Sequence, residues 1–204
     1  MKKIELNKVD KRINIINYTT NEYVDFIKRF NNRILYIKYR YQNKVYDMNI
    51  KINTSQLTHL MGFHYAYDTL SNKNRFRGKN SLNTLCKMDF GQIRRNIKKN
   101  KPYINGKLIS WEKDILPRIE YLPMALNTLE KRYKLKKRND NNILVKTKLK
   151  GHYFYYKITN ENVYLIFSII PISKSYTFES FIVNDGIRLL GPLDDLDIID
   201  ISFK

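Results

Sequence analysis

Cysteine is almost absent from this chain of 204 residues, in which Cys86 is the only one. One thiol cannot form an intrachain disulfide or a cysteine-rich zinc site, and such scarcity is typical of proteins in a reducing compartment. The first residues include lysines but no apolar stretch after them, so they do not resemble a secretory signal. We therefore expect a cytoplasmic protein.

Long apolar runs are missing as well. The longest candidate, Val163 to Ile172, is interrupted by Ser168 and Pro171, whereas a membrane-spanning helix needs about 18 apolar residues in succession. No segment combines a basic face with a wholly apolar one, which is the pattern of helices that lie on anionic membranes. We expect no membrane partner.

Sequence motifs for cofactors and metals are also absent. The seven glycines form neither a P-loop nor the glycine fingerprint of dinucleotide-binding folds. The three histidines, His59, His64 and His152, show no HExxH pattern and no convincing metal-ligand spacing with carboxylates. We expect neither a cofactor nor a bound metal ion.

Negative charge is scarce relative to positive charge. There are 38 Lys and Arg side chains against 19 Asp and Glu, for a formal net charge of +19, and the hydrophobic content of 43% is too high for a disordered chain. Ten basic side chains between residues 73 and 101 are opposed only by Asp89, and nine between residues 131 and 150 only by Asp140.

Clustered positive charge favours a nucleic-acid partner, because neutralising several phosphates of one backbone releases condensed counterions. A solvated helix and a flexible loop are the structural alternative for the same two segments. The candidate nucleic-acid contacts are Arg75, Arg77, Arg94, Arg95, Lys134, Lys136, Lys137 and Arg138.

The hydrophobic pattern changes period at the polar residues 139–142. Before them, apolar residues recur at helical spacing, as in Glu22–Phe30 with Asn21 as the expected N-cap, and the basic run 131–138 ends the last helical stretch. An earlier alternating pair, 33–41 and 44–52, predicts a β-hairpin. Later alternation predicts strands at 143–150, 153–159, 163–170 and 177–184, and short edge strands at 187–190 and 196–203.

These elements predict an α+β fold in which helices pack on an antiparallel β-sheet, with an N-terminal β-hairpin. We expect residues 1–30 to form a helical lead and residues 31–184 to form a single α+β domain. Residues 185–204 form an acidic C-terminal segment. Its aspartates, among them Asp194, Asp195, Asp197 and Asp200, oppose the charge of the rest, and its apolar residues favour packing on the sheet.

A few side chains could carry chemistry on RNA. A histidine such as His59 can exchange protons near neutral pH without a metal, although a hydrogen-bonded histidine at a helix–sheet seam is equally consistent with the sequence. On an ideal helix, His59 and His64 point to different sides. Lys146 and Lys148 share one face of the predicted strand 143–150; in a groove they would stabilise a phosphoryl group, and at an edge they would only block aggregation.

The order of these parts resembles a known group of proteins. The basic hairpin, the segment His59-Leu60-x-Gly62, the helical middle and the antiparallel strands through Val183 resemble the phage- and mobile-element-associated nuclease-like domains related to barnase, EndoU, colicin E5/D and RelE, particularly their fourth group. The resemblance implies a metal-independent ribonuclease over residues 31–184. It makes His59 the family histidine and places Lys146 or Lys148, and Thr177 or Ser180, at strand positions that face the substrate.

Two hypotheses follow. The first is an endoribonuclease, a toxin or phage-conflict effector that cleaves RNA and is held by an acidic antitoxin or inhibitor. The second is a non-catalytic module that grips RNA or DNA, or inhibits a host protein, with Tyr153, Tyr155 and Phe76 available for base stacking. An enzyme needs His59 and a basic strand around one cleft, whereas a binding module can spread its charges over a flat face.

Overall fold

The computed structural model describes residues 5–66, 81–104, 107–131, 133–138, 151–184 and 193–204. The chain divides into two compact units, each built from two segments. The helical unit comprises Met1–Asn31 and Asn53–Asn127, and the barrel unit comprises Asn32–Ile52 and Thr128–Lys204. The predicted span 31–184 contributes to both units.

The first helix of the helical unit, α1, spans Thr20–Lys28. Its N-cap is Thr19, not Asn21, because Thr19 and Glu22 form a capping box in which each side chain accepts a hydrogen bond from the other residue's backbone N–H. The unit also contains η1 (Leu6–Lys8), η2 (Ile15–Asn17), α2 (Thr54–Leu60), η3 (Phe63–Ala66), α3 (Ser81–Cys86), α4 (Phe90–Asn100), β3 (Tyr103–Ile104), β4 (Lys107–Leu108), the π-helical turn η5 (Trp111–Ile115) and α5 (Leu116–Asn127).

A buried ion pair fixes the N-terminal segment to α5. Glu120 is 5% exposed and accepts two hydrogen bonds from the Arg12 guanidinium, at 2.6 and 2.9 Å. The same carboxylate accepts the backbone N–H of Ile15. A charge this deeply buried is tolerated only when it is paired and hydrogen-bonded, as it is here.

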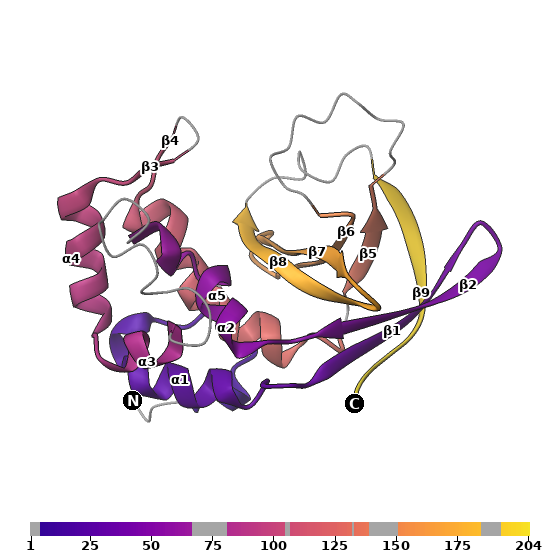
Figure 1. Cartoon of the computed structure of the whole chain (residues 1–204), viewed down its shortest axis with the longest axis horizontal. Coiled ribbons are helices and arrows are strands. Elements are labelled where there is room, and N and C mark those ends of the chain that lie inside the picture. The colour runs from indigo at the N-terminus through magenta and orange to yellow at the C-terminus, as the bar shows by residue number, and fades with distance from the viewer. Residues whose placement is uncertain (1–4, 67–80, 105–106, 132, 139–150, 185–192) are drawn as a thin grey trace. The chain divides into compact units, whose positions relative to one another are not determined.

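The barrel unit is a closed barrel of seven strands in the order β1-β2-β8-β7-β6-β5-β9 (Figure 1). The predicted hairpin is present, with β1 and β2 paired from Ile34 opposite Lys51 to Tyr41 opposite Lys44. All pairings are antiparallel except β2 with β8, which is parallel. The strands are β1 (Ile34–Tyr41), β2 (Lys44–Lys51), β5 (Lys134–Lys137), β6 (Tyr153–Ile158), β7 (Tyr164–Ile172), β8 (Ser175–Asn184) and β9 (Asp194–Phe203).

The predicted fold class is therefore wrong. We expected helices packed on an open antiparallel sheet, but the strands close on themselves into a mixed barrel. The helices belong to a separate compact unit. Alternating apolar residues predict that a strand has a buried face, and a barrel interior can cover that face as well as a helix layer can.

Strand β9 closes the barrel. We predicted a short edge strand at 196–203, but β9 lies between β1 and β5 and pairs with both. Its aspartates meet basic residues on either side: Asp197 lies 3.4 Å from Arg40 of β1, and Asp195 lies 3.0 Å from Lys136 of β5. The basic run 131–138, predicted as the end of a helix, contains strand β5 instead.

Aromatic rings fill the barrel interior. The buried ring of Phe167 lies 4.4 Å from Phe178 and 4.8 Å from Phe181, measured between centroids. Tyr155 is 1% exposed, stacks on Tyr133 at 4.5 Å, and donates its hydroxyl hydrogen bond to the backbone carbonyl of Leu129. Tyr155 is thus a core residue of the barrel.

Replacing a buried residue of β9 tests the closure. Leu196 is 6% exposed and lies opposite the buried Leu135. We expect Leu196→Ala to lower the free energy of unfolding by about 2–5 kcal/mol, as truncation of a buried leucine does. Ile199, which is 44% exposed on the same strand, is the control, and Ile199→Ala should cost about 0.5 kcal/mol. Equal effects of both variants in urea denaturation would contradict the closed barrel.

The buried tyrosines predict loss of stability at alkaline pH. Burial raises the pKa of Tyr153 to about 12 and raises the pKa of Tyr133 and Tyr155 still further. The folded state keeps these protons while the unfolded chain loses them from about pH 10, so stability is full below pH 10 and falls as the pH rises towards 12. The part of the tyrosinate absorbance that comes from these buried tyrosines should develop about one to two pH units higher in the folded protein than in guanidinium. If the folded and the denatured protein gave coincident titration curves, the burial of these tyrosines would be contradicted.

Candidate functional site

His59 lies at the exposed end of a short helix. Helix α2 ends at Leu60, and Gly62 takes a φ of +80°, a left-handed conformation that glycine adopts without steric cost. The chain then turns back into η3, which begins at Phe63 and contains His64. The expectation that the two histidines point to different sides assumed one continuous helix, and Gly62 ends that helix between them.

The turn at Gly62 stacks the two imidazoles. The ring centroids of His59 and His64 are 3.9 Å apart, with an interplanar angle of 21°. His59 is exposed and His64 is 6% exposed, so the pair extends from the surface inward. Tyr65 continues the group, with its ring centroid 3.8 Å from that of His64.

A cation from α5 joins this group. The Arg118 guanidinium carbon lies 5.7 Å from the centroid of the Tyr65 ring. A Cβ added at Gly62 would meet the Tyr65 ring at 3.4 Å and an Arg118 guanidinium nitrogen at 3.6 Å. We call His59, His64, Tyr65 and Arg118 the histidine cluster. It combines imidazoles, which exchange protons near neutral pH, with a guanidinium, which binds phosphate oxygens in a planar fork.

The basic helix α4 begins beside this segment. The ring of Phe63 in η3 lies 6.2 Å from that of Phe90, the first residue of α4. Asp89 caps the helix in a capping box with Gln92. Helix α4 carries the candidate nucleic-acid residues Arg94 and Arg95.

The two arginines of α4 have different surroundings. Arg94 and Lys98 form ion pairs with Glu112, at 3.2 and 2.9 Å. The hydrogen bond from Lys98 is the main reason that the pKa of Glu112 is lowered to about 2, and the bond from Arg94 adds to it. This one carboxylate therefore offsets one of the two positive charges.

Arg95 instead lines a polar groove of about 570 Å³ between α3 and α4. No carboxylate is found among the described residues that line it. The lining residues are Thr84, Lys87, Met88, Gln92, Arg95 and Asn96. Two cations surrounded by hydroxyl and amide groups form an environment that suits an anion such as a backbone phosphate.

The candidate nucleic-acid residues in and after β5 also differ in their surroundings. Lys136 has a side chain only 12% exposed, pairs with Asp195 and donates to the Leu193 carbonyl. Lys134 is exposed. The Lys137 ammonium lies 4.9 Å from the centroid of the Tyr41 ring, and the Arg138 guanidinium lies 5.8 Å from that of Phe154. Lys136 is thus held by β9, whereas Lys137 and Arg138 lie over aromatic rings.

The remaining predicted residues lie in the barrel unit or outside the described residues. Thr177 is 3% exposed and donates to the Lys51 carbonyl, and Ser180 lies half-buried in β8. Both belong to the barrel unit, whereas His59 belongs to the helical unit. Four other predicted residues lie outside the described residues: Arg75, Arg77, Lys146 and Lys148. A cleft shared by His59 and the lysine strand stays a prediction.

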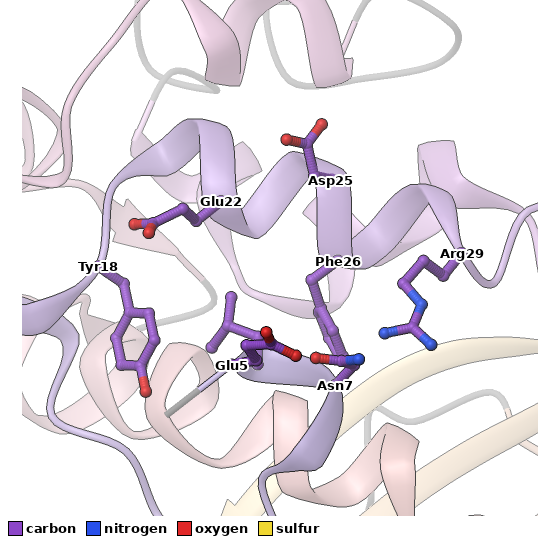
Figure 2. A pocket seen from close by; sticks show the side chains of 8 residues that line it. Glu5, Asn7, Tyr18, Glu22, Asp25, Phe26 and Arg29 are labelled. Carbon is purple, nitrogen blue, oxygen red and sulfur yellow. The ribbon is translucent and has the colours of Figure 1, made fainter. Parts of the chain in front are cut away.

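A second pocket of the helical unit is acidic. It has a volume of about 320 Å³, and Figure 2 shows Glu22 and Asp25 on α1 with Glu5 across from them. Arg29 and Asn7 also line it. Its carboxylates repel phosphate, so it does not belong to a nucleic-acid surface.

None of the described helices is long and apolar enough to cross a membrane. Across the part of the chain that the structure describes, no group of three or more His, Cys, Asp or Glu side chains is arranged to hold a metal ion.

Comparison with known proteins leaves the site to be judged on its own geometry. No family model matches the chain, and neither curated proteins nor solved structures give a match. The resemblance to nuclease-like domains therefore stays a prediction.

Two members of the histidine cluster were not predicted from the sequence. One of them, Tyr65, follows His64 after the turn at Gly62. A glycine in the sequence is a signal for a turn, but it does not show which rings stack after it. Arg118 lies in α5, far along the chain from His59. No local pattern connects the two residues, because their proximity depends on how the helices of the unit pack.

Removing the carboxylate that neutralises α4 should strengthen nucleic-acid binding. Glu112→Gln leaves Arg94 and Lys98 without their ion pairs, so RNA affinity at low salt should rise. The slope of log affinity against log salt should steepen by about 1 to 2, as expected for up to two added phosphate contacts. Glu161→Gln, at an exposed carboxylate in the turn between β6 and β7, is the control. Unchanged affinity and slope in Glu112→Gln would show that α4 does not face nucleic acid.

Proposed function

We propose that the protein is a metal-independent endoribonuclease in which His59 exchanges protons with the RNA. The observation that supports this best is the histidine cluster, in which an exposed imidazole stacks at 3.9 Å on a second imidazole beside an arginine near Gly62. The groove with Lys87 and Arg95 in the same unit supplies positive charge for the RNA backbone.

The reaction follows from what these groups can do. A 2′-hydroxyl gives its proton to a base and attacks the adjacent phosphorus, which forms the new O–P bond. The bond from phosphorus to the 5′-oxygen then breaks, and an acid protonates that oxygen. The products are a 2′,3′-cyclic phosphate and a 5′-hydroxyl. No step requires a metal ion.

In this reaction each member of the cluster has a distinct role. The exposed His59 is the acid or base that meets the RNA. His64, buried behind it, holds the His59 ring in place by stacking. Arg118 binds the phosphate and stabilises the extra negative charge of the pentacoordinate intermediate, where a fixed cation contributes more than it does in the ground state.

Substituting the histidine tests the proposal. We expect His59→Ala to lower the cleavage rate of a fluorogenic RNA about 10²-fold or more, the contribution of a general acid or base. Its free energy of unfolding should change by about 1 kcal/mol or less, because an exposed side chain contributes little packing. His152→Ala, at an exposed histidine of the barrel unit, should keep both activity and stability.

Two results would overturn this assignment. A fully active His59→Ala variant excludes the acid–base role. If His59→Ala unfolds while His152→Ala does not, His59 is a packing residue of the helical unit.

The second candidate function is a non-catalytic module that binds RNA or DNA. It is favoured by basic residues that belong to both units: Lys87 and Arg95 in one, Lys134, Lys137 and Arg138 in the other. This module would bind RNA with a steep salt dependence and leave it intact. The cleavage assay separates the two functions.

A cytoplasmic role as a toxin or phage-conflict effector, held by an acidic antitoxin or inhibitor, is part of the same proposal. A ribonuclease of this kind would inhibit growth when expressed, and the His59→Ala variant would not. The +19 charge would favour an acidic inhibitor, because opposite charges accelerate association and raise specificity.

A further inference from the structure

Five tyrosines gather at one end of the barrel. Ring contacts connect four of them, from Tyr46 through Tyr39 and Tyr153 to Tyr176. The fifth lies near the end of β1, beside Lys137 at the end of β5. We call them the tyrosine cluster: Tyr39, Tyr41, Tyr46, Tyr153 and Tyr176.

The rings extend from the barrel interior to the surface. Tyr39 is 5% exposed and stacks on its cross-strand partner Tyr46, with centroids 5.5 Å apart and an interplanar angle of 19°. Tyr46 is 40% exposed. The stack therefore runs from a buried ring to one that is partly open to solvent.

The inner tyrosines support this stack. Tyr153 contacts Tyr39 at a centroid distance of 6.2 Å, and their hydroxyls are 3.5 Å apart. Tyr176 meets Tyr153 edge to face at 5.6 Å. Burial is the main cause that raises the pKa of Tyr39, Tyr153 and Tyr176. The rings therefore stay neutral and do not repel a phosphate backbone.

A cation borders the same end of the barrel. Lys137 lies opposite both Tyr153 and Asp194 in the strand register, and its ammonium is 4.9 Å from the centroid of the Tyr41 ring. Asp194 accepts a hydrogen bond from the Tyr41 hydroxyl at 2.8 Å. A single-stranded nucleic acid is bound by this combination of aromatic faces for bases and cations for phosphates.

If these five residues only closed the end of the barrel, we would expect apolar side chains instead of tyrosines. Apolar side chains can close a barrel without leaving hydroxyls that need partners. They would not require a half-exposed ring at the hairpin, where Val45 beside Tyr46 is itself 55% exposed. The exposed end of the stack is the part that core packing does not explain.

We propose that the tyrosine cluster is a base-stacking site for single-stranded nucleic acid, with Tyr46 as the platform and Lys137 as a phosphate contact. This inference rests on the proposed function, because that function makes RNA the substrate. It gives the barrel unit the role of selecting single-stranded RNA over duplex RNA. In a duplex both faces of each base are already stacked, so the site selects against it.

The binding of a strand that cannot be cleaved tests this inference. The probe is an unstructured 2′-O-methyl RNA of about 12 nucleotides, which lacks the nucleophilic hydroxyl, with 2-aminopurine at one position. We expect it to bind about tenfold or more tightly than its duplex, and its fluorescence to be quenched by stacking. Tyr46→Ala should weaken single-strand binding about tenfold, the effect of losing one base–aromatic stack.

Matched variants identify the cause. Tyr46→Phe should bind like the parent, and so should Tyr103→Ala, which removes a tyrosine 67% exposed in the helical unit. Tyr46→Ala should keep the salt dependence of the parent, because no phosphate contact is lost. If Tyr46→Ala fails to fold by thermal melting, Tyr46→Leu, which keeps apolar volume but has no aromatic face, takes its place.

The outcomes separate this inference from the proposed function. Equal affinity for single strand and duplex, with parent-like binding by Tyr46→Ala, overturns the stacking site while cleavage by the parent protein upholds the ribonuclease. No binding to any nucleic acid overturns both.

Discussion

Strand β9 is the constraint on which the barrel unit depends. Without it, β1 and β5 would both be open edges, and the tyrosines and phenylalanines of the interior would face solvent. β9 is acidic, and it lies between two basic strands, with Asp197 near Arg40 and Asp195 near Lys136. In a chain of charge +19, an acidic strand lowers the repulsion that would otherwise oppose bringing those basic strands together. Burial of Leu196 supplies the apolar contribution to the same closure.

Ion pairs within the protein also engage several of the cations that the sequence offers to a ligand. Lys136 is paired by β9, and Arg94 and Lys98 are paired by Glu112. In the described part of the chain, Lys87 and Arg95 line the groove between α3 and α4, and Lys137 lies beside Tyr41 of the tyrosine cluster. A count of lysines and arginines overstates the nucleic-acid surface, because several of them hold the protein together.

Local patterns were sufficient for much of the secondary structure. The alternation of β1 and β2 predicted the hairpin, and apolar spacing predicted a helix at 22–30, which the structure has at Thr20–Lys28. The closure by β9 and the parallel pairing of β2 with β8 join residues more than a hundred positions apart. Periodicity predicts that a face is buried but not what covers it, so an open sheet under helices and a closed barrel have the same sequence pattern. Strand β5 was not predicted for a related reason. Its basic residues resemble the end of a solvated helix, because Asp195, which pairs with Lys136, lies near the C-terminal end of the sequence.

For the candidate site, the types of residue in the sequence indicated which side chains could exchange protons, but their positions in the sequence did not indicate which of them lie together. His59 could be chosen because few groups in the chain exchange protons near neutral pH, and Gly62 indicated where α2 ends. Arg118 and the tyrosine cluster depend on packing between distant elements, so no spacing in the sequence identifies them.

The central claim is that this protein cleaves RNA through its own side chains. The most direct measurement is to incubate the purified parent protein with total RNA in EDTA and to determine the chemistry of the new ends. The account predicts 2′,3′-cyclic phosphate and 5′-hydroxyl ends, with cleavage undiminished by the chelator. RNA that is bound but left intact, or ends of the opposite polarity that form only when divalent metal is added, would contradict it.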